Sequence, residues 1–282
     1  MASASSSSAD SARPAIRPTS PAHHAAGHEG AAPSAPSPRV GPGLAAPDAP
    51  HAADAAANAS ANDFARLVNN RHSCRAFLPE PPPAGTIERL VTLARAAPSG
   101  ANLQPGEFIL VAEAARERLC TALVDAWRSG AREAEDYTYF PEPMPLALRK
   151  RQVAAARALY DALGVARDDR KGRDAQFERN FRFFDAPLAL LVTIDAKLGA
   201  GAYMDLGMTL HGLLLAAAAE GLGACAIGAL ALYPRLIRQT LGLDPARNIV
   251  CGVALGYADE RAPVNRTRTA RSTLDDFFTV LR

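Results

Sequence analysis

The sequence predicts a folded domain that mixes helices and strands and begins near residue 61. Two stretches carry this prediction. Pro187 to Ile194 is a continuous apolar run of strand length, which is typical of a central strand covered on both faces. Tyr203 to Leu222 is apolar on nearly every face, so we expect a helix buried by the core or by a second subunit. Its ionisable residues Asp205, His211 and Glu220 disfavour a membrane span, and His211 is interpreted as a hydrogen-bonded interior histidine.

Residues 1–60 differ in composition from the rest of the chain. Ala, Ser, Pro and Gly dominate there, aromatic residues are absent, and no helix or strand period is present. Such a segment buries too little apolar surface to offset its chain entropy, so we expect a disordered extension before a domain at residues 61–282. Its four histidines are irregularly spaced, which makes a metal site a weak interpretation. No continuous apolar run follows Met1, so a secretory signal is not predicted.

Charge and cysteine content disfavour several classes of protein. The net charge is +2, from 31 Lys and Arg against 29 Asp and Glu, and no basic run is interleaved with aromatic residues. Binding to nucleic acid is therefore not predicted. The four cysteines are far apart and form no C-x-x-C pattern, which indicates neither a disulfide framework nor a zinc site. A reducing cytoplasm fits this cysteine usage best.

Apolar periodicity and turn residues place the elements of the domain in order. Six segments are expected to be helices: Asn62–Val68, Ile87–Ala94 with Thr86 as its N-cap, Ala114–Trp127, Leu146–Leu163, Tyr203–Leu222 and Pro234–Leu241. Four short apolar runs are expected to be strands: Phe108–Ala112, Pro187–Ile194, Cys225–Ile227 and Ile249–Leu255. The tail 261–271 is irregular and basic, and Leu274–Leu281 is expected to pair as an edge strand or to wrap onto another subunit.

The region from about residue 128 to 180 is the most polar part of the domain. Its first part is a loop that carries Tyr137, Tyr139 and Phe140 among several prolines, before the helix predicted from Leu146. Loops this long inside compact domains are usually lids or binding loops. We interpret the region as a cap that gives aromatic walls to a substrate pocket; a surface excursion is the alternative.

A short basic segment follows the first predicted helix. It brings Arg71, His72, Ser73 and Arg75 together within five residues. The planar guanidinium group of Arg matches the geometry of a phosphate, and Ser and backbone N–H groups can complete its coordination. The segment therefore indicates an anion site, with a solvated basic turn as the alternative.

A second polar loop lies between a predicted helix and a predicted strand. It spans residues 97–105 and combines small side chains with the amides of Asn102 and Gln104, bounded by Pro98 and Pro105. Such a loop is suited to hydrogen bonding along the edge of a ligand, and an ordinary turn is the other interpretation.

Four motifs occur in the order and spacing of the FMN-dependent nitroreductase family: R-H-S-C-R-A-F at 71–77, A-P-S-G-A-N-L-Q-P at 97–105, G-L-G-A-C-A-I-G at 221–228 and G-Y-A-D…P-V-N-R-T-R-T-A-R at 256–271. Beyond about residue 60 the chain resembles this family, and residues 136–137 and 180–187 resemble its branch acting on aryl nitro compounds. The resemblance implies an α+β fold, a three-layer sandwich with a central, mostly antiparallel sheet flanked by helices. It also implies an obligate homodimer with a swapped C-terminal extension and FMN at the interface.

The resemblance implies which residues contact the phosphate end of FMN. Arg71, His72 and Ser73 would hold the phosphate and the ribityl chain, and Arg271 would be a second phosphate ligand. Arg75 would place positive charge near N1 and O2 of the flavin. Thr269 departs from relatives that carry a second basic residue there, so that charge would come from Arg268 or Arg266.

A second group of implied contacts lies along the flavin ring. One loop would reach the isoalloxazine from the second subunit through Pro98, Ser99, Asn102 and Gln104. The backbone N–H of Gly228 would approach flavin N5, and the side chain of Ile227 would pack on the ring. Gly106 departs from the many members that carry an aromatic residue after Gln-Pro, which leaves the shape of that pocket wall open.

The activity implied by the resemblance is the transfer of reducing equivalents from NAD(P)H to nitroaromatics, quinones or a similar flat acceptor in a ping-pong cycle. The chain has no G-x-G-x-x-G motif after a strand, so NAD(P)H would share the substrate face of the flavin. The chemistry would lie at flavin N5, and no catalytic side chain or metal is predicted. Two alternatives stay open: a flavin-modifying or dehalogenating relative on the same fold, and a non-catalytic flavin-binding protein.

Overall fold

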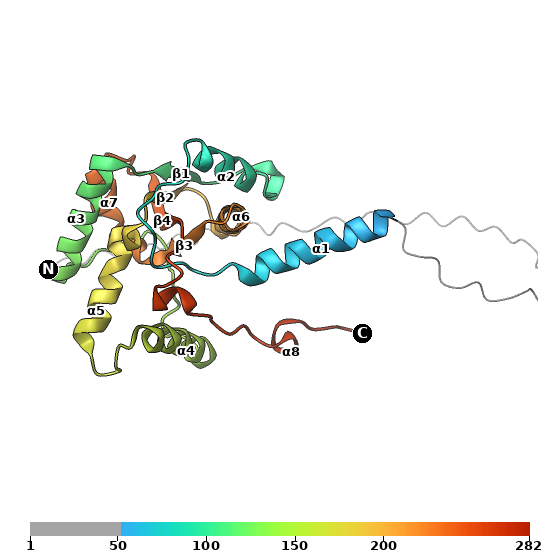
Figure 1. Ribbon diagram of the computed structural model, residues 1–282. Coiled ribbons are helices and arrows are strands. Elements are labelled where there is room, and N and C mark those ends of the chain that lie inside the picture. Colours follow the sequence, from blue (N-terminus) through green and yellow to red (C-terminus); the bar gives the residue numbers. More distant parts are fainter. Residues whose placement is uncertain (1–51) are drawn as a thin grey trace, which may run out of the picture. The chain divides into compact units, whose positions relative to one another are not determined.

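The structure of the protein, a computed structural model, describes residues 52–282 (Figure 1). Most of the extension predicted to be disordered lies outside this range. Its last residues belong to helix α1 (Ala52–Asn70), which begins well before the predicted start at Asn62. Alanine has the highest helix propensity and no proline lies within α1, so the helix continues toward the N-terminus.

A four-stranded antiparallel sheet lies at the centre of the fold, in the order β1-β2-β4-β3. The strands are β1 (Glu107–Leu110), β2 (Leu188–Asp195), β3 (Gly223–Ile227) and β4 (Arg247–Gly256). All four predicted strands are therefore present, with small shifts at their ends. Ser73 forms an isolated parallel bridge with Ala224, which attaches the basic segment to the free edge of β3.

Helices and short 3-10 turns connect the strands. The remaining helices of the described chain are α2 (Thr86–Ala94), α3 (Glu113–Ser129), α4 (Leu146–Leu163), α5 (Arg170–Glu178), α6 (Ala200–Ala219), α7 (Pro234–Leu241) and α8 (Leu274–Phe277). The turns are η1 (Gly100–Asn102), η2 (Arg179–Asp185), η3 (Gly228–Leu232) and η4 (Pro263–Arg266). Helices α4 and α7 have the bounds predicted from the sequence.

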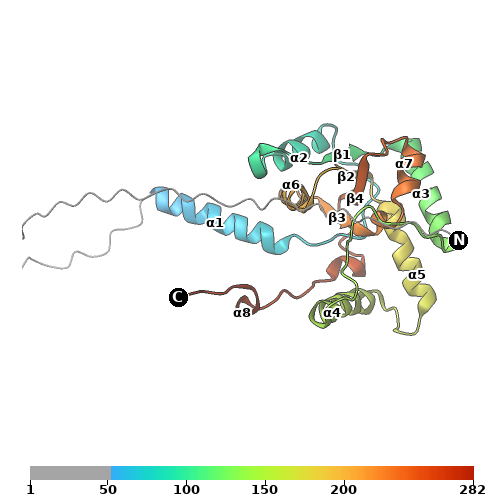
Figure 2. The same cartoon turned by 180° about the vertical axis from the view of Figure 1, so that it is seen from behind.

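The side chains of the sheet point alternately into two cores. Ala189 and Leu191 of β2 belong to a core with α3, α7 and η2, whereas Leu190 and Val192 belong to a core with α2 and α6. Figures 1 and 2 show these helices on opposite faces of the sheet. The period of two along a strand produces this division. The predicted α+β sandwich of three layers is confirmed, while the swapped C-terminal extension stays a prediction.

Helix α6 lies in the core, as its apolar sequence predicts. Leu206, Leu213 and Ala217 are almost completely buried against the sheet. Among the described helices, α6 alone has the length and apolar composition needed to cross a membrane. Its buried side packs on α2 and on β3, which is the role of a core helix in this fold.

Three local features differ from the sequence predictions. Thr86 does not cap α2, because Gly85 occupies the N-cap position and the Thr86 hydroxyl accepts a hydrogen bond from Arg89 instead. Leu274–Leu281 is not an edge strand, since Thr273 caps the short helix α8 by accepting a hydrogen bond from the backbone of Asp276, while its alternative, wrapping onto another subunit, stays a prediction. Helix α5 was not predicted, because its sequence is nearly all polar and shows no apolar period.

Candidate functional site

The basic segment is held in an extended conformation by backbone hydrogen bonds to two neighbouring elements. Cys74 N–H donates to the carbonyl of Ala224 on β3 at 3.0 Å, and Leu78 N–H donates to the carbonyl of Tyr257 at 2.9 Å. These bonds fix the backbone on both sides of Arg75. The side chains of the segment are therefore presented from an ordered edge of the sheet and not from a free turn.

Asn265 of η4 clamps this segment from the other side. Its side chain is buried, with 5% exposed, and accepts a hydrogen bond from Arg75 N–H at 2.8 Å. Its amide donates to the carbonyls of Ala76 at 2.7 Å and of Asp259 at 2.9 Å. One side chain thus joins the basic segment to the C-terminal tail. The sequence motif contained Asn265, but its role was not predicted.

The clamp brings the two ends of the domain together around a cavity of about 500 Å³. It is lined by basic, hydroxyl and amide side chains together with one apolar residue: Val68, Asn69, Arg71, His72, Ser73, Arg75, His211, Thr267, Arg268, Thr269 and Arg271. No carboxylate is among these described lining residues. Four guanidinium groups around one cavity produce a strongly positive potential, which favours an anion.

The guanidinium groups at the tail are positioned by carbonyl and hydroxyl oxygens. Arg268 donates to the carbonyl of Asn265 at 2.9 Å. Arg271 donates to the carbonyl of Thr269 at 2.9 Å and to its hydroxyl at 2.8 Å. Within the described chain, neither arginine forms an ion pair with a carboxylate. Their positive charges therefore remain available to a ligand, and of the two alternatives named for the charge that Thr269 lacks, Arg268 lines the cavity while Arg266 does not.

His211 corrects an expectation from the sequence. It was predicted to be an interior hydrogen-bonded histidine, but it is exposed on α6 and lines the basic cavity. The reason is that α6 is apolar on nearly all sides, whereas the sheet and α2 cover only part of its surface. The apolar pattern alone gave no signal for which side of α6 stays open.

The loop at residues 97–105 lies apart from the basic cavity. It is pinned to α6 by a buried carboxylate, since Asp205 accepts a hydrogen bond from Gly100 N–H at 3.0 Å. Ser99 Oγ accepts a second hydrogen bond from Gln104 N–H at 2.9 Å. Asn102 and Gln104 adopt positive φ values of 56° and 49°. These interactions hold a left-handed backbone that non-glycine residues rarely adopt, and both amide side chains are exposed.

The cap covers the other end of β3. A Cβ atom added at Gly228 would lie 2.8 Å from the ring of Tyr139, so the ring lies directly against this glycine. Tyr137 stands next to it and donates from its hydroxyl to the carbonyl of Val250 at 2.7 Å. Asp136 anchors the start of the cap by accepting from Ile249 N–H at 2.8 Å. These contacts place aromatic side chains beside Gly228, and the role of the region as a cap over a substrate pocket stays a prediction.

Ile227 differs from expectation. It is 1% exposed and packs in the core with α3, which differs from the predicted contact with a ring. Gly106, where the sequence left the shape of a pocket wall open, has a φ of 93°. A side chain at Gly106 would clash with Leu206, so an aromatic residue would not fit there.

The model of a known family matches most of the folded domain. The model described as "Nitroreductase family" matches residues 68–257 of this chain. The chain belongs to the nitroreductase family. The match begins just before the basic segment and ends at Tyr257, so it covers the sheet, the cap and three of the four motifs.

Individual relatives give the same result. The chain is 36% identical over 215 residues to a chloronitrobenzene nitroreductase of Comamonas testosteroni, covering 76% of this chain and 94% of the relative. It is 33% identical to a nitrobenzene nitroreductase of Ectopseudomonas oleovorans, with coverage of 76% and 94%. The FMN-dependent nitroreductase NfnB of Mycobacterium smegmatis, solved in complex with NADPH, has a TM-score of 0.75 and 32% identity, with coverage of 79% and 100%.

The cysteines of this nitroreductase-family chain are unreactive by environment. Burial raises the pKa of Cys74 to about 11 and that of Cys251 to about 12. Burial also raises the pKa of Cys225, while the positive charge of Arg75 opposes this shift. These thiols stay protonated at neutral pH, so they are poor nucleophiles. They serve as small apolar residues of the sheet.

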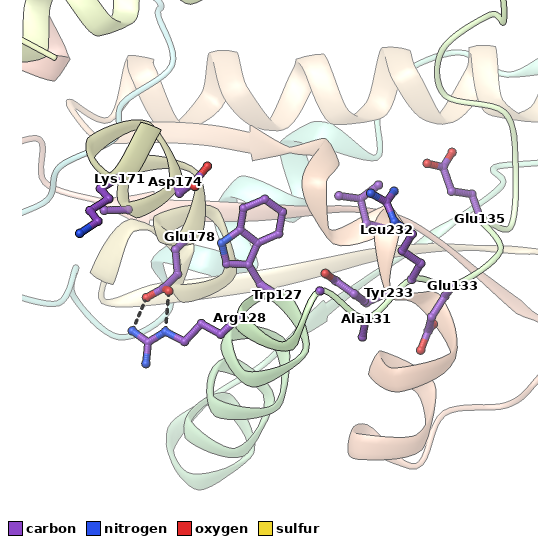
Figure 3. Close-up of a pocket in the computed structure, with 13 residues that line it drawn as sticks. Trp127, Arg128, Ala131, Glu133, Glu135, Lys171, Asp174, Glu178, Leu232 and Tyr233 are labelled. Atoms are coloured by element: carbon purple, nitrogen blue, oxygen red, sulfur yellow. Dashed lines mark hydrogen bonds and ion pairs between the residues drawn. The ribbon is translucent and has the colours of Figure 1, made fainter. Parts of the chain in front are cut away.

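A second cavity of this family member, about 710 Å³, lies between α3, α5 and η3 (Figure 3). Trp127 forms one wall, and Arg128 beside it donates to Glu178 at 2.7 and 2.9 Å. Glu133 accepts from Arg235 N–H at 2.8 Å at the start of α7. These charged groups join helices to one another. Of the described residues, those predicted to contact FMN do not line this cavity.

Proposed function

We propose that this protein is an FMN-dependent oxidoreductase that passes reducing equivalents from NAD(P)H to nitroaromatic compounds. The observation that carries the proposal is the cavity in which Arg71, Arg75, Arg268 and Arg271 converge without a lining carboxylate among the described residues. Membership of the nitroreductase family gives this anion site its chemical identity.

The lining of the basic cavity supports FMN as the bound anion. A phosphate group carries a charge of about −1.5 to −2 at neutral pH and accepts several hydrogen bonds, which suits a cavity lined by arginines and Ser73. Strand β3 leads from Ala224, beside Ser73, to Gly228 under Tyr139. Four residues of strand span about 13 Å. That length is comparable with a ribityl phosphate chain and part of the flavin ring.

The chain would bind and orient the cofactor and exclude water from it. Arg71 and Arg271 would hold the phosphate, with His72 and Ser73 beside them, and Arg75 would place positive charge near flavin N1 and O2. Bound FMN would supply the hydride chemistry at its N5 atom. Gly228 has no side chain, but the ring of Tyr139 lies against it, so this ring would have to move for the flavin ring to approach the backbone there. The cap would shield the reacting face from bulk water.

The proposal of a nitroaromatic electron acceptor rests on the relatives. The chloronitrobenzene and nitrobenzene nitroreductases named above are similar to this chain over 94% of their own length. The full-length protein, loaded with FMN, should oxidise NADPH continuously when nitrobenzene or 4-nitrobenzoate is present. Oxidation limited to one equivalent per flavin would instead support a non-catalytic flavin-binding protein.

Tyr139→Ala should raise the KM for nitrobenzene by about twofold to tenfold, because an aromatic contact contributes about 0.5 to 1.5 kcal/mol. FMN should remain bound, since Tyr139 does not line the basic cavity. Tyr139→Phe keeps the ring and serves as the matched control, with a KM close to that of the wild type. Equal KM values for all three proteins in steady-state assays would remove Tyr139 from the acceptor site.

We also propose a homodimer in which each FMN site draws on both chains. Large apolar side chains are exposed on α6 and on the C-terminal tail: Met204 at 66%, Phe277 at 85% and Leu281 at 92%. Exposed apolar surface of this kind is typical of an interface. The loop with Pro98, Ser99, Asn102 and Gln104 would reach the flavin bound by the second chain.

Subunit mixing tests the shared site. An Arg71→Ala subunit and an Asn102→Ala subunit should each be weakly active alone. After mixing and reassociation, each heterodimer should contain one intact site and one doubly defective site, because the two substitutions then fall on the same site. Recovery of flavin-dependent turnover is therefore expected, and a mixture no more active than its parents would overturn the shared site.

The FMN-binding domain is proposed to span residues 61–282 together with the earlier turns of α1, with the cap at residues 128–180. A cytoplasmic location is proposed from the free thiols of all four cysteines, three of which are buried. Membrane and nucleic-acid partners are not part of the proposal.

A further inference from the structure

Helix α4 of the cap presents an unusual face to the surface. Its residues at helical spacing form one continuous stripe: Leu146, Arg149, Lys150, Val153, Ala154 and Arg157. They line a shallow depression of about 380 Å³. Leu146 is 69% exposed and Val153 is 53% exposed. A stripe of this kind normally faces a core, but here it faces outward with cations along an apolar floor.

The three cations of the stripe are free to bind a ligand. In the described chain, the side chains of Arg149, Lys150 and Arg157 make no hydrogen bond or ion pair with another residue. The acidic residue of α4 is Asp161, one turn beyond Arg157, and it does not line the depression. The face therefore combines unpaired positive charge with an apolar surface, which suits an anionic group attached to a flat apolar ring.

The position of α4 connects this face to the proposed flavin site. Figures 1 and 2 both show α4 beside the C-terminal segment, where it packs on η4, the turn that carries Asn265. At its other end, α4 begins seven residues after Tyr139, a chain length of at most about 25 Å. The stripe itself extends about 16 Å along the helix. The chain length from Tyr139 is an upper limit, so the start of the stripe lies no farther than about 25 Å from Tyr139.

We propose that this face of α4 binds the 2′-phosphoadenosine group of NADPH and thereby selects NADPH over NADH. Arg149, Lys150 and Arg157 contact the 2′-phosphate, and the adenine packs on Leu146 and Val153. The inference rests on the proposed function, because it assigns the coenzyme of the same reaction. It goes beyond that function by assigning the residues that distinguish the two coenzymes.

A basic amphipathic helix also occurs on membrane surfaces, but the dimensions of this face favour a small anion. Membrane binding needs a broad apolar face along the whole helix. Here the apolar floor is limited to Leu146, Val153 and Ala154 within about three turns. The rest of the helix toward Leu163 is half-buried against the protein.

The test compares the wild type with the triple variant Arg149→Ala, Lys150→Ala and Arg157→Ala in the full-length, FMN-loaded protein. The KM for NADPH should rise by about tenfold to a hundredfold, because charge-assisted hydrogen bonds to the phosphate are lost. The KM for NADH and both kcat values should change by less than about twofold. Arg151→Ala, a cation of the same helix outside the stripe, is the matched control and should leave both KM values unchanged.

A binding measurement separates this inference from the proposed function. Calorimetry should detect adenosine 2′,5′-bisphosphate binding to the wild type at least about tenfold more tightly than 5′-AMP, and the triple variant should lose this difference. This readout needs no turnover, so an inactive protein would contradict the proposed function without deciding the coenzyme site. Equal binding of the two nucleotides by the wild type, or equal losses for NADPH and NADH in the variant, would overturn the inference. Cosedimentation with phosphatidylserine vesicles that depends on the three cations, without nucleotide discrimination, would also overturn it.

Discussion

Replacing Arg71 and Arg271 together by alanine is expected to weaken FMN binding by about a hundredfold to ten-thousandfold and to leave riboflavin binding nearly unchanged. Each charge-assisted hydrogen bond to a phosphate contributes about 1.5 to 3 kcal/mol, so two lost contacts amount to about 3 to 6 kcal/mol. Riboflavin lacks the phosphate and makes neither contact. The two guanidinium groups line the same cavity although they come from opposite ends of the domain.

Titration of the apo-protein with both flavins, followed by fluorescence quenching, measures this difference. Arg271→Ala alone should weaken FMN by about tenfold to a hundredfold. Arg118→Ala removes an exposed arginine of α3, away from the cavity, and should change neither affinity. Equal losses for FMN and riboflavin in the double variant would mean that these arginines support the fold and do not bind the phosphate.

Asn265→Leu is expected to lower the free energy of unfolding by about 3 to 5 kcal/mol and to release FMN. Leucine is close in size to asparagine but leaves Arg75 N–H without its partner and removes one hydrogen bond from each of the carbonyls of Ala76 and Asp259, which keep backbone donors. An unsatisfied buried N–H costs about 1 to 3 kcal/mol, and each lost hydrogen bond about 0.5 to 1.5 kcal/mol. The basic segment also loses its connection to the tail, so Arg75 and Arg271 are no longer held around one cavity.

Urea unfolding of the wild type and the variant provides the measurement, with a reduced midpoint and an unchanged slope expected. Gln152→Leu on the exposed side of α4 is the control and should change stability by less than about 0.5 kcal/mol. A loss below about 1 kcal/mol for Asn265→Leu would show that water replaces the lost partners and that the clamp is weak.

The layers of the fold could be predicted because the apolar pattern of each helix and strand is visible in its own sequence. The continuous apolar run of β2 and the nearly all-apolar α6 predict a sheet covered by helices, and both are present. Helix α5 was not predicted, because its sequence is nearly all polar and shows no apolar periodicity. The helix begins after Asp169, whose side chain accepts a hydrogen bond from Gly172 N–H at 2.8 Å. The exposure of His211 depends on how much of α6 its neighbours cover, which the sequence of α6 does not contain.

The candidate site was only partly predictable, because its residues converge from distant parts of the chain. The basic character of residues 71–75 is visible in the sequence, and Arg71, Ser73, Arg75 and Arg271 do line one cavity. The bond between Arg75 and Asn265 joins residues 190 positions apart, and no local pattern indicates it. The contact of Tyr139 with Gly228 is also remote in sequence. The resemblance to a family placed Arg71 and Arg271 on one phosphate, but it indicated neither of these two contacts.

One cuvette experiment tests the central claim most directly. The purified full-length protein is reconstituted with FMN, made anaerobic, treated with one equivalent of NADPH and then with nitrobenzene, while the flavin absorption is recorded. We expect the flavin bands to bleach on addition of NADPH and to return on addition of nitrobenzene. A protein that does not retain FMN, or whose bleached flavin is not restored by nitrobenzene, would contradict the assignment of an FMN-dependent nitroaromatic reductase.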